Sequence, residues 1–224
     1  MTGELIGRGR DCDVFEAGPG RVLRRNRGGR STEVEALTMR HCAAHGYPVP
    51  EVFDADGPDI VMQRLDGPTM LGDLSARPWT MRAKARQLAE LIEHLRRVPL
   101  PDHQLRTAVD DGDILVHLDL HPDNVVLTSD GPIVIDWSNC GVGVAGLDAA
   151  NTWLTLSAGQ PDSSPLMRTV VAAGRRFFVH GFVSSIDRSA AVRELPRALE
   201  LRLRDTNLSD AERATMQALV ERVT

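Results

Sequence analysis

The sequence predicts an α+β protein with two lobes, a small antiparallel-sheet lobe in front and a mostly helical lobe behind. Short strand-like segments separated by glycine turns occupy the first 65 residues, and helical periodicity dominates the remainder. The length of 224 residues is enough for one or two domains with a substantial core. We therefore expect one lobe at residues 1–65, a second at 66–224, and a small-molecule site in the cleft between them.

The front lobe is expected to hold five short strands and one helix. The segments ELIGRG and DVFEAG flank one glycine-containing turn, and RVLRR follows a second turn at GPG. Two further strands lie on either side of Asp56-Gly57-Pro58. Between these pairs, the segment STEVEALTMRHCAAHG begins with capping residues and ends at Gly46, which predicts a helix.

The rear lobe begins with a clear amphipathic helix. The segment WTMRAKARQLAELIEHLRRV carries apolar residues at i, i+3 and i+4 spacing, which predicts a buried helix face. Two short strands follow, joined by a hairpin turn at Asp130-Gly131. Beyond Leu147 we expect helices, interrupted near Gln160-Pro161, Ser185 and Asn207.

The composition points to the cytoplasm and away from membranes. No apolar run approaches the roughly 20 residues needed to span a bilayer, and the first residues contain no signal-peptide core. The three cysteines (Cys12, Cys42 and Cys140) are scattered and show no metal-ligand spacing. We interpret them as reduced thiols and expect no membrane partner.

The formal charge of −5 hides a difference between the two parts of the chain. Residues 151–224 carry 8 acidic and 10 basic residues, whereas the first 150 residues carry 23 acidic and 16 basic residues. The segment Arg21–Arg30 is the one basic cluster in the sequence. Because it has no interleaved aromatic residues and lies in the acidic part of the chain, we expect no nucleic-acid partner.

Histidines, aspartates and asparagines are concentrated between runs of valine and isoleucine in the window Val116–Asn139. Buried carboxylates are costly unless they are paired or bind a metal. His117, Asp119 and His121 alternate, so on one strand they would face the same side, like the ligands of a zinc site. Pro122 disrupts strand pairing beyond that point and no further histidine cluster follows, which makes the zinc interpretation the weaker one.

A phosphoryl-transfer site explains the same residues better. Asp119 is followed five positions later by Asn124, and after a hairpin by Asp136, in the order of the phosphoryl-transfer template. The Asn124 carbonyl and the Asp136 carboxylate supply the oxygen ligands that Mg²⁺ prefers beside nucleotide phosphates. Asp119 would orient or deprotonate the acceptor hydroxyl. We interpret His117 and His121 as structural supports of this loop.

The segments HLDLHPDNVVL and IVIDWSN resemble the catalytic loop and the metal-binding segment of the aminoglycoside phosphotransferase and choline kinase-like family, relatives of protein kinases. The resemblance implies a two-lobed protein-kinase-like fold and transfer of a γ-phosphoryl group to a hydroxyl of a small molecule. It also implies Mg²⁺ and ATP as cofactors, with GTP as an alternative nucleotide. Three positions deserve comparison with the family: Asp123 replaces a frequent glycine, Gly146 replaces a frequent acidic residue, and Asp148 is retained in a structural or acceptor-side role.

In the front lobe, the resemblance places a phosphate-covering loop at Gly7 and Gly9. Cys12 replaces the third glycine of the protein-kinase pattern, and a plain hairpin turn explains the segment equally well. The resemblance also implies that VMQRLDG links the lobes. The backbone of Gln63 and Leu65 would then hydrogen-bond the nucleotide base.

Arg24 stands where the family carries its phosphate-binding lysine, and Arg25, on the other side of the strand, is the second choice. Arginine keeps the charge and offers a bidentate fork, but it does not reproduce a lysine. Glu35 is the expected helix partner of this cation, with Glu33 as the alternate. Glu35 also completes a capping box with Thr32, and we favour the ion pair over this interpretation.

The acceptor stays open at this point. Polycationic aminoglycosides need an acidic pocket, which the family builds largely from its C-terminal helices, and here that region has a net charge of +2. A neutral or anionic hydroxylated metabolite, or a macrolide-like antibiotic, fits at least as well. The alternative function is a pseudokinase that binds a nucleotide or a partner, suggested by Arg24 and Cys12. The intact Asp119, Asn124 and Asp136 favour the active enzyme, and the sequence leaves its oligomeric state open.

Overall fold

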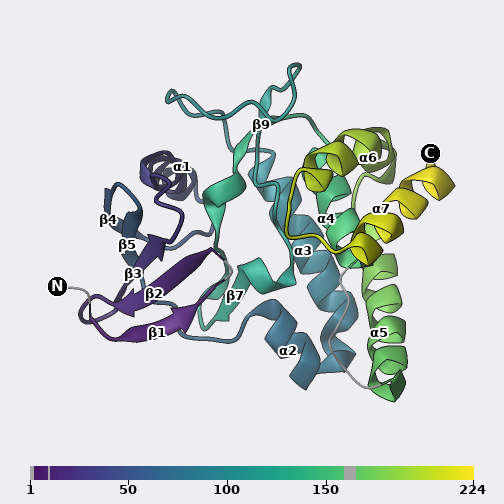
Figure 1. The fold of residues 1–224 in the computed structure, drawn as a ribbon, viewed down its shortest axis with the longest axis horizontal. Coiled ribbons are helices and arrows are strands. Elements are labelled where there is room, and N and C mark those ends of the chain that lie inside the picture. Colours follow the sequence, from purple (N-terminus) through teal and green to yellow (C-terminus); the bar gives the residue numbers. More distant parts are fainter. Residues whose placement is uncertain (1–2, 10, 159–164) are drawn as a thin grey trace.

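The computed structural model describes residues 3–9, 11–158 and 165–224 (Figure 1). The front of the chain forms an antiparallel sheet with the strand order β1-β2-β3-β5-β4 and a helix, α1, that packs against β4. The prediction of five strands and one helix in this region is confirmed. The elements are β1 (Leu5–Arg8), β2 (Cys12–Glu16), β3 (Arg21–Asn26), α1 (Glu33–Ala44), β4 (Val52–Asp56) and β5 (Asp59–Gln63).

Two local features set the boundaries of α1. The Thr32 hydroxyl donates to the carbonyl oxygens of Gly57 and Asp59, at 3.1 and 2.8 Å, and so ties the start of α1 to the β4–β5 hairpin. The Thr32 side chain therefore caps no helix N–H group, and the alternative capping box with Glu35 does not form. Gly46, with a φ of 76°, ends the helix in the left-handed conformation that glycine adopts most easily.

The linker after β5 passes very close to the rear lobe. Gly67 has a φ of 151°, and a Cβ atom at this position would lie 2.1 Å from the carbonyl oxygen of Leu127. Only glycine fits such an approach. The division into lobes at residues 1–65 and 66–224 remains a proposal, and the absence of regular structure between Gln63 and Met70 is compatible with it.

The rear lobe contains helices and two small antiparallel sheets, β6–β9 and β7–β8. The predicted long helix and the predicted hairpin are both present, whereas α2, β6 and β9 are short elements that the sequence did not predict. The predicted break near Gln160-Pro161 lies outside the described residues. The elements are α2 (Met70–Ala76), α3 (Met81–Leu95), β6 (Ile114–Val116), β7 (Val125–Thr128), β8 (Gly131–Val134), β9 (Gly141–Gly143), α4 (Leu147–Ala158), α5 (Pro165–Val183), α6 (Arg188–Leu203) and α7 (Asp210–Val223).

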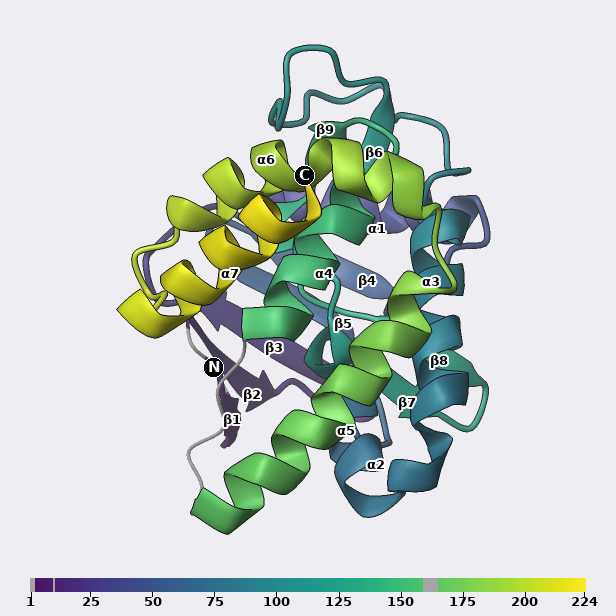
Figure 2. The same cartoon turned by 90° about the vertical axis from the view of Figure 1, so that its right-hand side faces the viewer.

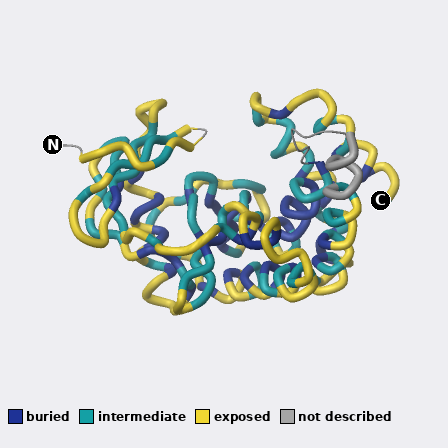
Figure 3. The backbone as a smooth tube through the Cα atoms, turned by 90° about the horizontal axis from the view of Figure 1, so that it is seen from below, coloured by how far each residue is buried: buried dark blue, intermediate teal, exposed yellow. Residues whose placement is uncertain are grey.

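The core lies mainly in the helical lobe. Helix α4 contacts α5, α6 and α7, and α3 packs along α5, so α4 is enclosed by its neighbours (Figure 2). Burial is concentrated around these helices, while the front sheet is mostly half-buried or exposed (Figure 3). Within the described residues, no helix combines the length and the apolar character needed to cross a bilayer. The enclosed helix α4 therefore offers a rigid platform for the loop that follows β6.

Three arginines of the Arg21–Arg30 cluster contact other groups of the protein. Arg21 stacks over the ring of Phe53 at 4.1 Å, and Arg25 forms an ion pair with Asp59. Arg30 donates to the carbonyl oxygen of Ser138 at 2.9 Å. These side chains thus hold the front lobe together and attach it to the rear lobe.

Candidate active site

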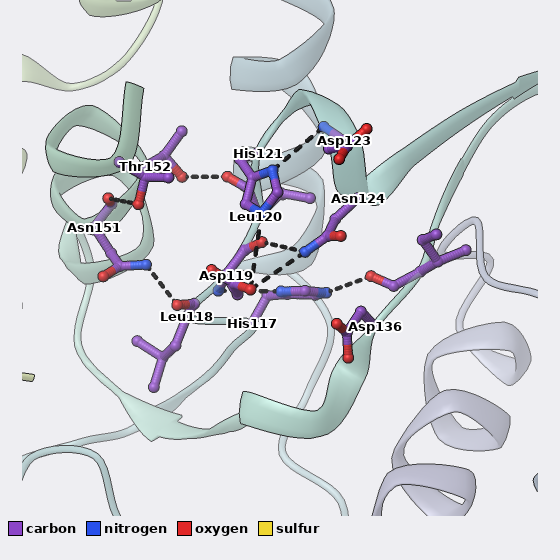
Figure 4. A network of polar contacts seen from close by, with 12 residues as sticks. His117, Leu118, Asp119, Leu120, His121, Asp123, Asn124, Asp136, Asn151 and Thr152 are labelled. Atoms are coloured by element: carbon purple, nitrogen blue, oxygen red, sulfur yellow. Dashed lines mark hydrogen bonds and ion pairs between the residues drawn. The ribbon is translucent and has the colours of Figure 1, made fainter. Parts of the chain in front are cut away.

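The loop between β6 and β7 carries Asp119 and is held by buried polar groups of α4 (Figure 4). The two carboxylate oxygens of Asp148 accept the backbone N–H groups of His117 and Leu118, at 2.8 and 2.7 Å. Leu118 has a φ of 62°, which is unfavourable for a residue with a side chain. Asp148, buried at the start of α4, therefore stabilises a strained backbone directly before Asp119.

Two more side chains of α4 continue this support. The Asn151 amide donates to the carbonyl oxygen of Leu118 at 2.5 Å, and the Thr152 hydroxyl donates to that of Leu120 at 2.7 Å. Both side chains are buried. Of these three α4 residues, only Asp148 was predicted from the sequence. Their spacing from Asp148, at i+3 and i+4 on one face of the helix, was the available signal.

His117 has a structural role in this loop. Its Nε2 donates to the carbonyl oxygen of Ile135 at 3.2 Å, and its Nδ1 accepts the backbone N–H of Asp119 at 3.3 Å. Complete burial lowers the pKa of His117, so the ring is neutral at physiological pH. Because both ring nitrogens are engaged, neither is available to a metal. In the part of the chain that the structure describes, no group of three His, Cys, Asp or Glu side chains is arranged to hold a metal ion.

Asp119 is surrounded by hydrogen-bond donors. The Asn124 amide donates to its backbone carbonyl at 2.9 Å and to its Oδ2 at 3.4 Å, and the Nη1 of Arg202 lies 2.9 Å from its Oδ1. Burial raises the pKa of Asp119, but His121 and Arg202 outweigh this effect and hold the pKa below its usual value. Asp119 is therefore ionised at neutral pH. Arg202 was not predicted from the sequence, because it lies 83 positions from Asp119 and belongs to no local motif.

Asn124 and Asp136 are brought together by the backbone. The N–H of Ile135 donates to the carbonyl oxygen of Asn124 at 3.0 Å, which places the residue after Ile135 beside the catalytic loop. Asp136 has a φ of 62° and a ψ of 68°, a left-handed conformation of the kind found at functional sites. Since the Asn124 nitrogen points to Asp119, its amide oxygen is left to face elsewhere. Two oxygen donors on adjacent segments suit a magnesium ion that also takes phosphate oxygens and water.

Arg24 joins this centre to the front lobe. Its Nη2 forms an ion pair with Glu35 of α1, and its Nη1 lies 3.3 Å from Oδ1 of Asp136. The other carboxylate oxygen of Glu35 accepts the backbone N–H of Trp137 at 3.1 Å. Burial lowers the pKa of Arg24, but Glu35 and Asp136 outweigh it and the net pKa lies above the usual value. The structure thus brings together Arg24 and Glu35 from the predicted set, whereas Arg25 pairs with Asp59.

The model of the phosphotransferase enzyme family matches residues 62–184, more than half of the chain, including Asp119, Asn124 and Asp136. The chain belongs to this family. The predicted resemblance is confirmed, and with it the prediction of a small-molecule kinase as the class of enzyme. Among curated proteins, none matches the sequence.

Solved structures of several kinases and phosphotransferases share the fold. Aminoglycoside phosphotransferase APH(4)-Ia is 18% identical with a TM-score of 0.65, covering 97% of this chain and 92% of its own. A choline/ethanolamine kinase family protein from Mesorhizobium loti is 18% identical with a TM-score of 0.54, covering 98% and 86%. Amicoumacin kinase hAmiN, solved with AMP-PNP, Ca²⁺ and Ami, is 12% identical with a TM-score of 0.54, covering 98% and 87%. The predicted protein-kinase-like fold is therefore confirmed.

In this family member, the predicted phosphate loop is the β1–β2 hairpin. The backbone N–H of Gly9 donates to the carbonyl oxygen of Cys12 at 2.8 Å and closes the turn, and Gly7 lies opposite Val14 in the ladder. Arg27 donates to the Gly9 carbonyl at 2.8 Å. This geometry agrees with a plain hairpin turn as well as with a loop over phosphates, so both interpretations stay open.

The expected contacts to a nucleotide base need one correction. The N–H of Gln63 donates to the carbonyl oxygen of Glu51 at 2.8 Å, because Gln63 ends strand β5. That N–H group is therefore not available for a base. Of the backbone groups of Gln63, only the carbonyl oxygen is therefore still proposed to contact the base, together with the backbone of Leu65.

Proposed function

We propose that this protein is an ATP-dependent kinase that transfers the γ-phosphoryl group to a hydroxyl of a small molecule. The observation that carries the proposal is the convergence of Asp119, Asn124 and Asp136 on one loop-and-hairpin unit, linked by the Ile135–Asn124 hydrogen bond. Family membership gives the reaction class. The ionised carboxylate of Asp119, surrounded by hydrogen-bond donors, is where we propose that the acceptor hydroxyl binds.

Asn124 and Asp136 are proposed to hold magnesium, which neutralises phosphate charge when bound. A neighbour in fold supports a divalent cation beside the nucleotide, since amicoumacin kinase was solved with AMP-PNP and Ca²⁺. Arg24 would bind the phosphates while Glu35 keeps its guanidinium in place. Gly7 and Gly9 would cover the phosphates, and the carbonyl of Gln63 and the backbone of Leu65 would hold the base of ATP or, as the alternative, GTP.

Asp119 acts on the acceptor. Its carboxylate is ionised and can accept the hydroxyl proton while orienting the oxygen for in-line attack on the γ-phosphorus. Most of the rate enhancement in such a reaction comes from positioning and from charge stabilisation. The α4 side chains that bind the loop backbone supply that positioning. Because the three cysteines are free thiols, we place the enzyme in the cytoplasm, where ATP is present.

Acceptor-dependent ADP formation tests the proposal. The wild-type protein is incubated with Mg·ATP and aminoglycosides, macrolides, amino alcohols or hydroxy acids, with Asp119→Ala as the control. We expect turnover with at least one acceptor and its loss by a factor of about 10² or more in Asp119→Ala, since a positioned base contributes about 10²–10⁴. Equal turnover in both proteins would refute the role of Asp119. Failure of wild type to bind Mg·ATP would favour the pseudokinase alternative acting as a partner-binding module.

A further inference from the structure

An arginine of the C-terminal helices binds the carboxylate that faces the acceptor. Arg202 lies in the last turn of α6, and its Nη1 is 2.9 Å from Oδ1 of Asp119. The two side chains are largely shielded, with exposed fractions of 14% and 19%. The Nε of Arg202 is buried and has no hydrogen-bond partner among the described residues. The Nη1–Asp119 ion pair therefore uses only part of the donor capacity of this guanidinium.

The position of Arg202 is fixed by the turn that follows it. Arg213 of α7 donates to three backbone carbonyls of this turn, those of Leu203, Asp205 and Leu208, at 2.8, 2.5 and 3.2 Å. Such a clamp holds the end of α6 against α7 and limits the directions in which Arg202 can move. The packing of α6 and α7 thus places Arg202 beside Asp119, and Arg202 is not a freely moving surface side chain.

More positive charge surrounds this end of α6. Burial lowers the pKa of Arg106, and the nearby charges of Arg30 and Arg204 lower it further. Arg106 donates to the carbonyl oxygen of Asn139 and Arg30 to that of Ser138, both at 2.9 Å. The loop after Asp136 is therefore bordered by cations from two separate segments.

A groove lies beside the loop that follows Asp136. It has a volume of about 480 Å³ and is lined by Arg30 and Arg106, whereas Asp119 and Arg202 are not among its lining residues. In the described part of the chain, Glu35 is the acidic residue among its lining, and the ion pair with Arg24 already neutralises that charge. The groove therefore presents a positive surface, which attracts anions and repels polycations.

We propose that Arg202 selects an acceptor that carries an anionic group, a carboxylate or a phosphate, close to the hydroxyl that is phosphorylated. The proposal rests on the function proposed above and deepens it. A cationic acceptor would place its ammonium group close to the positive guanidinium of Arg202. The Asp119 carboxylate could not compensate, because it is already paired with Arg202. An anionic group can instead take the guanidinium in a bidentate contact, which is the geometry that arginine favours.

Replacement of Asp119 by the acceptor's anionic group as the partner of Arg202 also prepares the reaction. When the anionic group of the acceptor binds Arg202, Oδ1 of Asp119 becomes free to accept the proton of the adjacent hydroxyl. The hydroxyl oxygen then forms a bond to the γ-phosphorus, and the bond from that phosphorus to the β–γ bridging oxygen breaks. The proton passes to Asp119, and the products are ADP and a phosphomonoester. Arg202 is thus a specificity-determining residue and leaves the phosphoryl chemistry to the other groups.

A charge-sorted acceptor panel tests the proposal. Hydroxy acids (glycolate, D- and L-glycerate, 3-hydroxybutyrate), sugar phosphates (glucose 6-phosphate, ribose 5-phosphate) and cations (ethanolamine, choline, kanamycin) are compared in acceptor-dependent ADP formation. The variant is Arg202→Gln. Its matched control is Arg197→Gln, which removes the same charge from the same helix but affects an exposed pair with Asp111. The first two classes distinguish a carboxylate from a phosphate.

We expect wild-type turnover with an anionic class and not with the cations. Arg202→Gln should raise KM for that acceptor about 10- to 100-fold, as expected for losing a charge-assisted hydrogen bond, with a smaller change in kcat. Arg202→Lys should recover part of the loss, and Arg197→Gln should resemble wild type. Turnover confined to cations, silence with every anion despite intact Mg·ATP binding, or an unchanged KM in Arg202→Gln would each overturn the proposal. Loss of Mg·ATP binding in wild type would instead overturn the proposed function.

Discussion

At the scale of single residues, Arg24 shows what an arginine can do that a lysine cannot. Its two terminal nitrogens contact two different carboxylates, Glu35 through Nη2 and Asp136 through Nη1. A lysine has one nitrogen and would have to share it between these partners. The fork therefore connects α1 of the front lobe with the proposed metal-binding segment of the rear lobe, and it leaves Glu35 paired although the side chain is buried.

Removing this cation should be costly for stability. Arg24→Met leaves the Glu35 carboxylate buried without its partner, and we expect a loss of about 3–5 kcal/mol in the free energy of unfolding, measured by urea denaturation. The double variant Arg24→Met/Glu35→Leu should recover most of this loss, because no uncompensated charge remains. Arg25→Met is the matched control, since its pair with Asp59 is far less buried than the Arg24–Glu35 pair, and it should change stability less. If Arg24→Met were as stable as Arg25→Met, the buried pair would have no structural role.

At the scale of elements, the packing of α6 on the start of α4 determines where Arg202 lies. Gly146 precedes α4 with a φ of 96°, and a Cβ atom there would lie 2.6 Å from the carbonyl group of Ala190 in α6. The glycine at this position thus has a steric reason. Any side chain at Gly146 would push α6 away from α4.

Gly146→Ala tests this packing, with Gly18→Ala as its control. The two glycines have φ values of 96° and 97°, but nothing lies within 4 Å of a Cβ atom at Gly18. Both variants pay for a left-handed residue, roughly 1–2 kcal/mol, and only Gly146→Ala adds a clash with backbone. We expect Gly146→Ala to be clearly the less stable in urea denaturation. Equal losses for the two variants would contradict the close contact of α6 with α4.

The elements also show which parts of this structure the sequence could predict. The front sheet, the helix at 33–44 and the 125–134 hairpin have local turn, capping and periodicity signals, and all of them formed. The β6 and β9 strands have three residues each and depend on pairing with each other, so a local pattern cannot reveal them. The contact of Arg202 with Asp119 is still harder to predict, because it depends on how α6 packs and no sequence motif indicates it.

At the scale of the whole molecule, the proposed catalytic centre lies where the two lobes meet. The Arg24–Asp136 and Glu35–Trp137 contacts link the front sheet and α1 to the segment that follows β8. The catalytic loop itself is attached to the most enclosed helix, α4, while the front lobe is less buried (Figure 3). This arrangement gives Asp119 a well-buried support in the rear lobe.

The central claim is that Asp136, together with Asn124, holds the metal through which the protein binds ATP, while Asp119 serves the acceptor. Calorimetric titration of ATP into wild type, Asp136→Ala and Asp119→Ala, each with Mg²⁺ and with EDTA, tests it most directly. We predict magnesium-dependent binding in wild type and in Asp119→Ala, and loss of that dependence in Asp136→Ala. Unchanged magnesium-dependent affinity in Asp136→Ala would contradict the account.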